Sequence, residues 1–177
     1  METLEAIGHQ RVVRTFLPGP LPDDLVTTIL EAGRRAGSSK NLQRWAFITI
    51  TERATLERLS KVGPWCGHIA GAATAIALVT PDPRADAAPL SVMWDLGRAA
   101  QNMTLAAWDS GVGACPGTVY EQTECRDALG YPADHHCEFI LSLGYPVDPT
   151  DLSRPLRAGG RRGLDSMLHQ ARWGGVR

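Results

Sequence analysis

The chain has 177 residues, the length of one ordinary domain, and its 44% hydrophobic content is sufficient for a packed core without disulfides or metals. A net charge of -1 provides no general attraction for nucleic acid or anionic lipid. The N-terminus does not read as a leader peptide, and the longest near-apolar run, residues 69–79, is too short for a membrane helix. We therefore expect a single cytoplasmic domain over residues 1–177. Its four scattered cysteines, which form no C-x-x-C pair, favour buried, reduced thiols.

The first half of the chain alternates predicted helices and strands. A short helix is expected over residues 3–9, and a clearer one over residues 22–36, where apolar residues recur at helical spacing. A strand over residues 45–51, a short helix over residues 54–62 and a second strand over residues 73–79 follow. Turn residues separate each of these elements from the next.

The second half begins with a short loop over residues 81–89 and the longest helical pattern, residues 90–109. That helix has little polar surface, so it should be buried on most sides. A glycine-rich turn over residues 111–118, a short helix ending at Gly130 and an apolar strand over residues 138–143 come next. Helices and strands mixed without strict alternation favour an α+β architecture over a doubly wound parallel sheet.

The tail over residues 147–177 is rich in proline, arginine and glycine and has few apolar residues. Those few include Leu164, Met167, Leu168 and Trp173, which are poorly suited to making a core of their own. Packing against a partner subunit would bury them.

Two arginine pairs are candidate anion ligands. Arg11 and Arg14 lie three residues apart and can converge on one anionic group if they follow a helix end, and Arg161 with Arg162 could clamp a phosphate. Taken alone, either pair is more often a pair of solvated surface arginines, in the first case around a buried Val13.

Two further segments carry residues suited to a flat heteroaromatic ligand. The loop with Ser38, Ser39, Asn41 and Gln43 offers hydroxyl and amide groups between a helix and a strand, although it could be an ordinary polar turn. The small residues of segment 111–118 would let the backbone approach a ring closely and offer N–H groups to it, and a simple tight turn is equally compatible.

These groups occur in an order and spacing typical of one family. Residues 10–16 are similar to its R-R-S-x-R-x-F pattern, and residues 36–45 to its A-P-S-x-x-N-x-Q-P-W pattern. Residues 95–102 resemble the start of its long central helix, residues 143–146 its last core strand, and residues 161–164 its terminal G-R-[KR]-P-L element. Over nearly its whole length the chain resembles the nitroreductase family.

The resemblance implies a central, mostly antiparallel sheet flanked by helices, and a C-terminal tail exchanged across a homodimer. It also implies FMN at the dimer interface, contacted by arginines at its phosphate, ribityl and pyrimidine oxygens and by the serine-rich loop of the other subunit. The cofactor-binding residues it implies are Arg11, Val12, Arg14, Ser38, Ser39, Asn41, Gln43, Pro116, Gly117, Thr118, Arg161 and Arg162.

The implied activity is a ping-pong reaction in which NADH or NADPH reduces FMN, and the flavin then reduces a nitroaromatic, a quinone or an activated alkene. The flavin carries the chemistry, so no side chain is required as acid, base or nucleophile. We expect no metal site, because the adjacent His135, His136 and Cys137 have no second pair of ligands.

Four positions depart from the family pattern: Gln10, Val12, Gly37 and Arg44. The first two replace phosphate-contacting residues, and the last two alter the loop that meets the flavin. A biosynthetic dehydrogenase of the same fold and a non-catalytic flavin-binding protein therefore remain alternative functions. The short loop over residues 81–89 predicts an open, undiscriminating substrate site.

Overall fold

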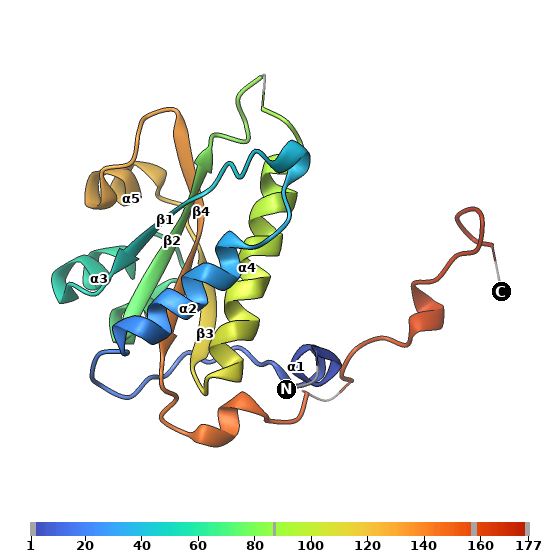
Figure 1. Ribbon diagram of the computed structural model, residues 1–177, viewed down its shortest axis with the longest axis horizontal. Helices are drawn as coiled ribbons and strands as arrows, with labels where there is room; N and C mark the ends of the chain where they lie inside the picture. Colours follow the sequence, from blue (N-terminus) through green and yellow to red (C-terminus); the bar gives the residue numbers. More distant parts are fainter. Residues whose placement is uncertain (1–2, 87, 157–158, 176–177) are drawn as a thin grey trace.

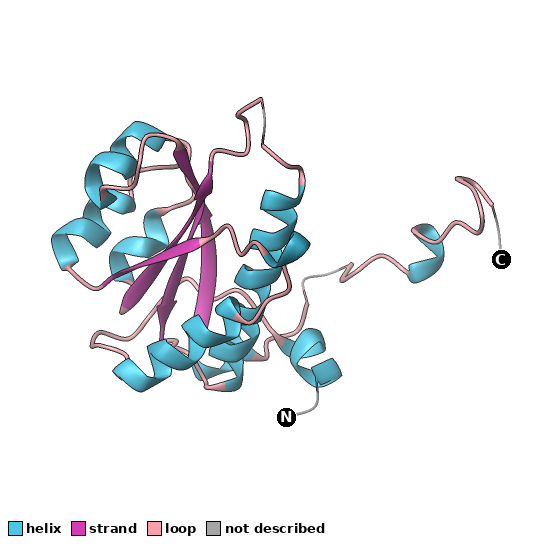
Figure 2. Cartoon of the chain, turned by 45° about the horizontal axis from the view of Figure 1, so that its top comes forward, coloured by secondary structure: helices cyan, strands magenta, loops and turns pink. Residues whose placement is uncertain are grey.

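The centre of the molecule is a four-stranded sheet in which every pair of neighbouring strands is antiparallel. The computed structural model describes residues 3–86, 88–156 and 159–175. Its strands are β1 (Ala46–Ile50), β2 (Thr74–Pro81), β3 (Gly113–Thr118) and β4 (His135–Gly144), in the spatial order β1-β2-β4-β3. Helices cover both faces of the twisted sheet (Figures 1 and 2). The expected α+β class and antiparallel sheet are confirmed.

The helices lie close to where their sequence signals place them. The α-helices are α1 (Thr3–His9), α2 (Asp23–Arg34), α3 (Arg53–Leu59), α4 (Ser91–Asp109) and α5 (Gln122–Leu129). Four short 3-10 helices are η1 (Ser39–Asn41), η2 (Gly67–Gly71), η3 (Pro149–Leu152) and η4 (Leu164–Ser166). Gly130 ends α5 with a φ of 71°, a left-handed conformation that glycine adopts without steric cost.

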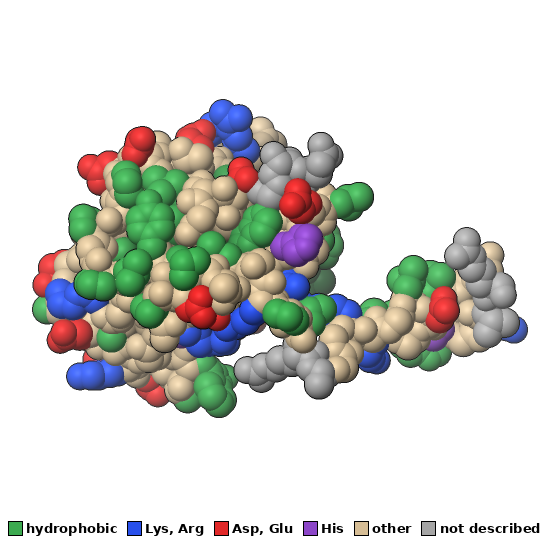
Figure 3. Space-filling model, turned by 90° about the horizontal axis from the view of Figure 1, so that it is seen from below, with side chains coloured by type: hydrophobic (Ala, Val, Ile, Leu, Met, Phe, Trp, Pro, Cys, Tyr) green, Lys and Arg blue, Asp and Glu red, His purple; other side chains and the backbone are tan. Residues whose placement is uncertain are grey.

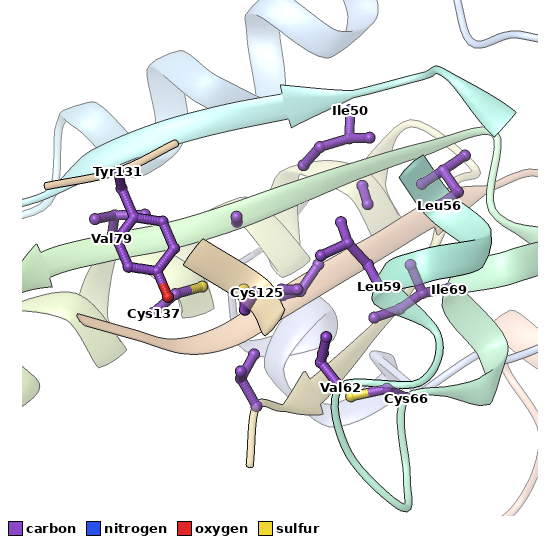
Figure 4. Close-up of a cluster of buried hydrophobic side chains, with 14 residues drawn as sticks. Ile50, Leu56, Leu59, Val62, Cys66, Ile69, Val79, Cys125, Tyr131 and Cys137 are labelled. Carbon is purple, nitrogen blue, oxygen red and sulfur yellow. The ribbon is translucent and has the colours of Figure 1, made fainter. Parts of the chain in front are cut away.

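Two hydrophobic clusters hold the helices to the two faces of the sheet. On one face, shown in Figure 4, α3, α5 and η2 pack Leu56, Leu59, Cys125 and their neighbours against the strands. On the other face, α2 and α4 cover the strands and meet at Gly33, which leaves room for the Met103 side chain. Successive strand residues point to opposite faces. One cluster therefore contains Ile140 of β4 and the other contains Leu141.

The prediction of a glycine-rich turn over residues 111–118 is wrong, because residues 113–118 form strand β3. This strand pairs along its whole length with β4, from Gly113 opposite Gly144 to Thr118 opposite Phe139. Its small residues are required by close packing rather than by a turn. A Cβ atom at Gly113 would lie 2.6 Å from the Cβ atom of Val13, so the N-terminal segment could not lie beside the strand.

Beyond η3 the chain leaves the body of the molecule, and the tail with η4 extends into solvent (Figure 1). The tail's apolar side chains Leu164, Met167, Leu168 and Trp173 are exposed, and Trp173 is 89% accessible. Trp94 on α4 is also exposed, so part of this helix is uncovered in the single chain, contrary to burial on most sides. No helix among the described residues is long and apolar enough to cross a membrane.

Candidate functional site

The segment of residues 11–16, called here the N-terminal strap, lies along the end of the sheet formed by β3 and β4. Val12 forms a parallel bridge with Ala114, and Phe16 an antiparallel bridge with Pro146. The Val13 N–H donates to the Ala114 carbonyl at 3.1 Å, and the Val13 side chain is completely buried. The strap therefore fixes Arg11 and Arg14 on either side of a buried residue, next to β3.

The two strap arginines have different surroundings. The Arg11 guanidinium donates to three backbone carbonyls, those of Gly8 (2.8 Å), Gln10 (2.9 Å) and Arg154 (2.9 Å). The Arg14 side chain is exposed, and it makes none of the hydrogen bonds or ion pairs found among the described residues. Of the two cations, Arg14 is the one with its donors available to a ligand.

A surface pocket of about 390 Å³ lies beside Arg14. Its lining residues come from the strap, from β3, from η2 and from the segment leading into η2: Arg14, Pro64, Trp65, Gly67, His68 and Pro116. On β3, the carbonyls of Ala114 and Thr118 point away from β4, to Val13 and to the Cys66 thiol. Because backbone direction alternates along a strand, Pro116 also faces outward at this sheet edge, the position that proline tolerates in a sheet.

A chain of polar contacts leads from this pocket into the sheet. His68 Nδ1 lies 2.7 Å from the Ser142 hydroxyl, and His68 Nε2 lies 3.4 Å from the Cys115 sulfur. A Cβ atom at Gly117 would lie 3.3 Å from Nε2, so the glycine admits the ring. Burial lowers the pKa of His68, and the nearby Arg14 charge lowers it further. Both effects favour the neutral imidazole.

The serine-rich loop is anchored at the other end of the molecule, beside the start of α4. The Ser39 N–H donates to the buried Asp95 carboxylate at 2.9 Å, and the Gln43 N–H donates to the Ser38 hydroxyl at 3.0 Å. The Gln43 amide donates to the Asn41 side-chain oxygen at 3.1 Å. These contacts hold the polar side chains of the loop in a defined arrangement on the surface.

The backbone of this loop is held in an unusual conformation. Lys40, Asn41 and Gln43 have φ values of 53°, 54° and 46°, in the left-handed region that non-glycine residues rarely occupy. Such residues cluster at ligand sites, where surrounding contacts maintain the strain. Gly37 precedes the loop, and the guanidinium of the exposed Arg98 lies where a Cβ atom on Gly37 would be. The glycine in place of the family's proline thus accommodates Arg98.

Arg44, the other departure in this loop, is partly buried. Its Nη1 atom is inaccessible to solvent and has no hydrogen-bond partner among the described residues. A buried guanidinium nitrogen without a partner is costly. A hydrogen-bond acceptor placed next to Arg44 Nη1 would therefore stabilise the loop region.

The predicted site residues form three separate groups in one chain. The strap and β3 bring Arg14 together with Pro116, whose neighbours Gly117 and Thr118 continue the strand. The loop with Ser38, Ser39, Asn41 and Gln43 lies at the opposite end of α4 (Figure 1). Arg161 and Arg162 are exposed in the tail, away from both groups; Figure 3 shows the tail standing clear of the body.

Sequence reasoning missed three residues of this region: His68, Asp95 and Ser142. A lone histidine before a strand and a lone serine within one carry no recognisable pattern. Asp95 had a usable signal, because it lies in a helix that was expected to be buried on most sides, and a buried acidic residue must find a hydrogen-bond partner.

The same architecture occurs in known proteins. A model described as the nitroreductase family matches residues 7–66 and 61–145. The chain belongs to the nitroreductase family. A protein of Archaeoglobus fulgidus, provisionally named NADH dehydrogenase/NAD(P)H nitroreductase, is 31% identical over 178 residues, which cover 97% of this chain and 99% of that protein.

Solved structures share the fold. That of a Parabacteroides distasonis protein with the same provisional name has a TM-score of 0.83, with 24% identity over 97% of this chain and 98% of that one. The structure of an FMN-dependent nitroreductase of Clostridium difficile has a TM-score of 0.74 and 22% identity, over 94% of each chain. The resemblance and the fold class are thus confirmed, and the chain is an oxidoreductase of this family.

Proposed function

We propose that this nitroreductase-family protein binds FMN and uses NADH or NADPH, by a ping-pong mechanism, to reduce nitroaromatics, quinones or activated alkenes. The observation that carries the proposal is the pocket beside β3. There the Arg14 guanidinium, with no protein hydrogen-bond partner among the described residues, meets the outward-facing backbone at Pro116. A donor-bearing cation beside a bare sheet edge suits a flat, electron-accepting ring.

The residues present fit an FMN molecule in their chemistry. When bound, FMN supplies the ability to take hydride from NAD(P)H and pass reducing equivalents to an acceptor. Arg14 would stabilise negative charge on the pyrimidine side of the ring, and the backbone of Pro116, Gly117 and Thr118 would lie against it. Arg11, Arg161 and Arg162 would share the phosphate, with Arg11 contributing the Nη2 group that its carbonyl contacts leave available.

Val12 and the polar loop would complete the binding site. Val12 has no hydroxyl, so its contribution would be through the strap backbone. Ser38, Ser39, Asn41 and Gln43 would contact the flavin with hydroxyl and amide groups already ordered by Asp95 and by one another. The strain in the loop would then serve to present these groups in advance of binding.

One chain cannot bring its loop to its own Arg14. Ser39 is tied to Asp95 near the start of α4, whereas His9, just before the strap, stacks on Trp108 near its end. At 1.5 Å per residue these points are about 20 Å apart along the helix. A second copy, with its α4 antiparallel to the first, would place its loop beside Arg14. Burial of Trp94 and exchange of the tail, with its exposed Trp173, would accompany this homodimer.

The substrate would enter an open site. The exposed Trp65 lines the pocket and offers an aromatic wall for a flat acceptor, next to the Arg14 cation. The segment between β2 and α4 is short, so it contributes little cover. These features favour a broad range of electron-poor aromatic acceptors over a single shaped substrate.

Anaerobic reduction tests the proposal. The purified protein should be yellow or take up FMN, and NADH or NADPH should bleach the bound flavin until a quinone or nitroaromatic restores its colour. Arg14→Ala should reduce FMN uptake, while Arg34→Ala, which removes an exposed arginine paired with Glu31, should not. A protein that takes up no FMN would refute the proposal. Bound flavin that neither nucleotide bleaches would indicate a flavin-sequestering protein, and bleaching without quinone turnover a biosynthetic dehydrogenase.

Complementation tests the shared site. Arg14→Ala and Asn41→Ala subunits, when co-expressed, form heterodimers in which one of the two sites has both wild-type residues, if each site takes Arg14 from one subunit and the loop from the other. Random assortment should restore about a quarter of wild-type FMN sites. No recovery over the separate variants would place both residues in the same subunit's site.

A further inference from the structure

Ser142 is completely buried near the C-terminal end of β4, opposite Cys115 of β3, and its hydroxyl reaches the edge of the Arg14 pocket only through His68. Besides its 2.7 Å contact with His68 Nδ1, the Ser142 hydroxyl lies 3.3 Å from the Cys115 carbonyl oxygen. Because the Ser142 hydroxyl has one proton to donate, these two contacts restrict which ring nitrogen of His68 carries a proton.

The contacts favour one placement of the protons. If Ser142 donates to the Cys115 carbonyl, its oxygen can accept from His68 Nδ1–H, and His68 Nε2 carries a lone pair. The Cys115 thiol can then donate to Nε2 at 3.4 Å or turn to the Pro116 carbonyl at 3.6 Å. In the opposite tautomer the Ser142 hydroxyl would have to donate to Nδ1 in place of the Cys115 carbonyl, and Nε2–H would lie 3.4 Å from the Cys115 sulfur, which is a weak acceptor.

We propose that Ser142 positions His68 as the Nδ1–H tautomer, so that Nε2 accepts a hydrogen bond from an N–H group of the ligand next to Arg14. A guanidinium donor and an imidazole acceptor on one pocket match an imide edge, where a carbonyl oxygen lies next to an N–H group. The pyrimidine side of a flavin has such an edge. The inference rests on the proposed function only for the identity of this ligand.

The charges around His68 make this acceptor sensitive to pH. Arg14 is the cation that faces the ring, Cys115 and Cys66 are the titratable groups nearby, and the carbonyls of Trp65 and Pro116 partly favour the protonated ring. Protonation would convert Nε2 from an acceptor to a donor and place a second cation beside Arg14. Ligand affinity should therefore decline in acid, below the ordinary histidine pKa near 6.5.

The tautomer can be measured without reference to any flavin. The ring nitrogens of a neutral histidine have widely separated ¹⁵N shifts, and His68→Gln identifies which of the five histidine signals is His68. At pH 7.5 the wild-type protein should show protonated Nδ1 and unprotonated Nε2, and Ser142→Ala should shift the population toward Nε2–H. A predominant Nε2–H tautomer in the wild type would overturn the inference even if FMN binds normally.

FMN titrations then test the role of the acceptor. At pH 7.5, His68→Ala should raise the FMN Kd about 3- to 10-fold, as expected for one lost hydrogen bond, and His68→Gln should recover most of the affinity through its side-chain carbonyl. Ser142→Ala should act in the same direction. The FMN phosphate titrates near pH 6, so each variant is compared with the wild type at the same pH.

As the pH is lowered through the pKa of His68, followed by the ¹⁵N shifts of its ring, the advantage of the wild type over His68→Ala should disappear. Two matched controls, His135→Gln at the far end of β4 and Thr80→Val, which removes another buried hydroxyl of the sheet, should leave the Kd unchanged. Equal affinity of His68→Ala and wild type at pH 7.5, or an advantage that persists once the ¹⁵N shifts show His68 protonated, would overturn the inference. Absence of FMN binding in the wild type would instead refute the proposed function and leave the tautomer result intact.

Discussion

The side chains of Arg11 and Arg154 tie the N-terminal strap to the segment after β4. The Arg11 Nε–H donates to the Arg154 carbonyl at 2.9 Å, and the Arg154 Nη2–H donates to the Val12 carbonyl at 2.6 Å. Arg154 is in turn paired with Asp151 of η3 at 2.7 Å. The two hydrogen bonds hold the N-terminal strap against the segment after β4, so Arg11 has a structural role whatever its ligand.

We therefore expect Arg11→Ala and Arg14→Ala to differ in kind. Arg11→Ala should lower the free energy of unfolding by about 1 kcal/mol, since its hydrogen bonds are largely solvent-exposed. Arg14→Ala should leave stability unchanged within about 0.5 kcal/mol and weaken FMN binding at least tenfold. Urea unfolding of both variants measures the change in stability, and FMN titration measures the change in affinity. Equal loss of stability in the two variants would contradict it.

Asp95 should control the order of the serine-rich loop. Because its buried carboxylate accepts the Ser39 N–H, Asp95→Ala should leave that N–H without its partner and cost about 1.5 to 3 kcal/mol of stability. FMN affinity should decline in parallel as the loop loses its anchor. Asp95→Asn keeps an acceptor oxygen and should show a smaller loss in both measurements. Hydrogen exchange at Ser39 provides a direct check, and unchanged protection in Asp95→Ala would refute the anchoring role.

Gly113→Ala should separate the strap from the sheet. The added methyl group would lie 2.6 Å from the Val13 Cβ atom, so either the strap or β3 has to move. Such overpacking typically costs about 1 to 3 kcal/mol. FMN binding should weaken because Arg14 moves with the strap. Gly71→Ala, at a position outside the pocket with open space around the glycine, provides the control.

Alkaline pH should destabilise the protein through its buried thiols. Burial raises the pKa of Cys66 to about 11, and it also raises that of Cys115. The unfolded chain loses these protons near pH 8.5, whereas the folded chain keeps them, so the unfolded state binds fewer protons and stability declines as the pH rises from about 8.5 toward 11. Urea midpoints from pH 7 to 11 should show this decline, and Cys66→Ala should make it shallower.

The sequence predicted the elements whose residues repeat with a clear period, and it missed those that depend on distant contacts. Helix α2 and strand β2 were found because their apolar residues face one layer or are buried throughout. Strand β3 was missed because its pattern, Gly-Ala-Cys-Pro-Gly-Thr, reflects the strap and the His68 ring packed against it rather than a hydrophobic face.

The candidate site divides in the same way. Arg14 and the serine-rich loop could be located from their order along the chain, because the resemblance extends over those residues. Their separation at opposite ends of α4 could not be predicted from the sequence, since it depends on how the strap and the loop pack against that helix. The roles of Ser142 and His68 depend on cross-strand neighbours that no local spacing reveals.

The contacts of the strap also constrain the order in which the protein is assembled during synthesis. Backbone hydrogen bonds join Val13 to Ala114, Leu17 to Tyr145 and Thr15 to Val147. Residues made at the start of translation therefore acquire their partners only in the later part of synthesis. Contacts this far apart in sequence form late and slowly. The Arg14 pocket cannot close on a nascent chain shorter than these partners, so flavin uptake would report completed folding rather than assist its early stages.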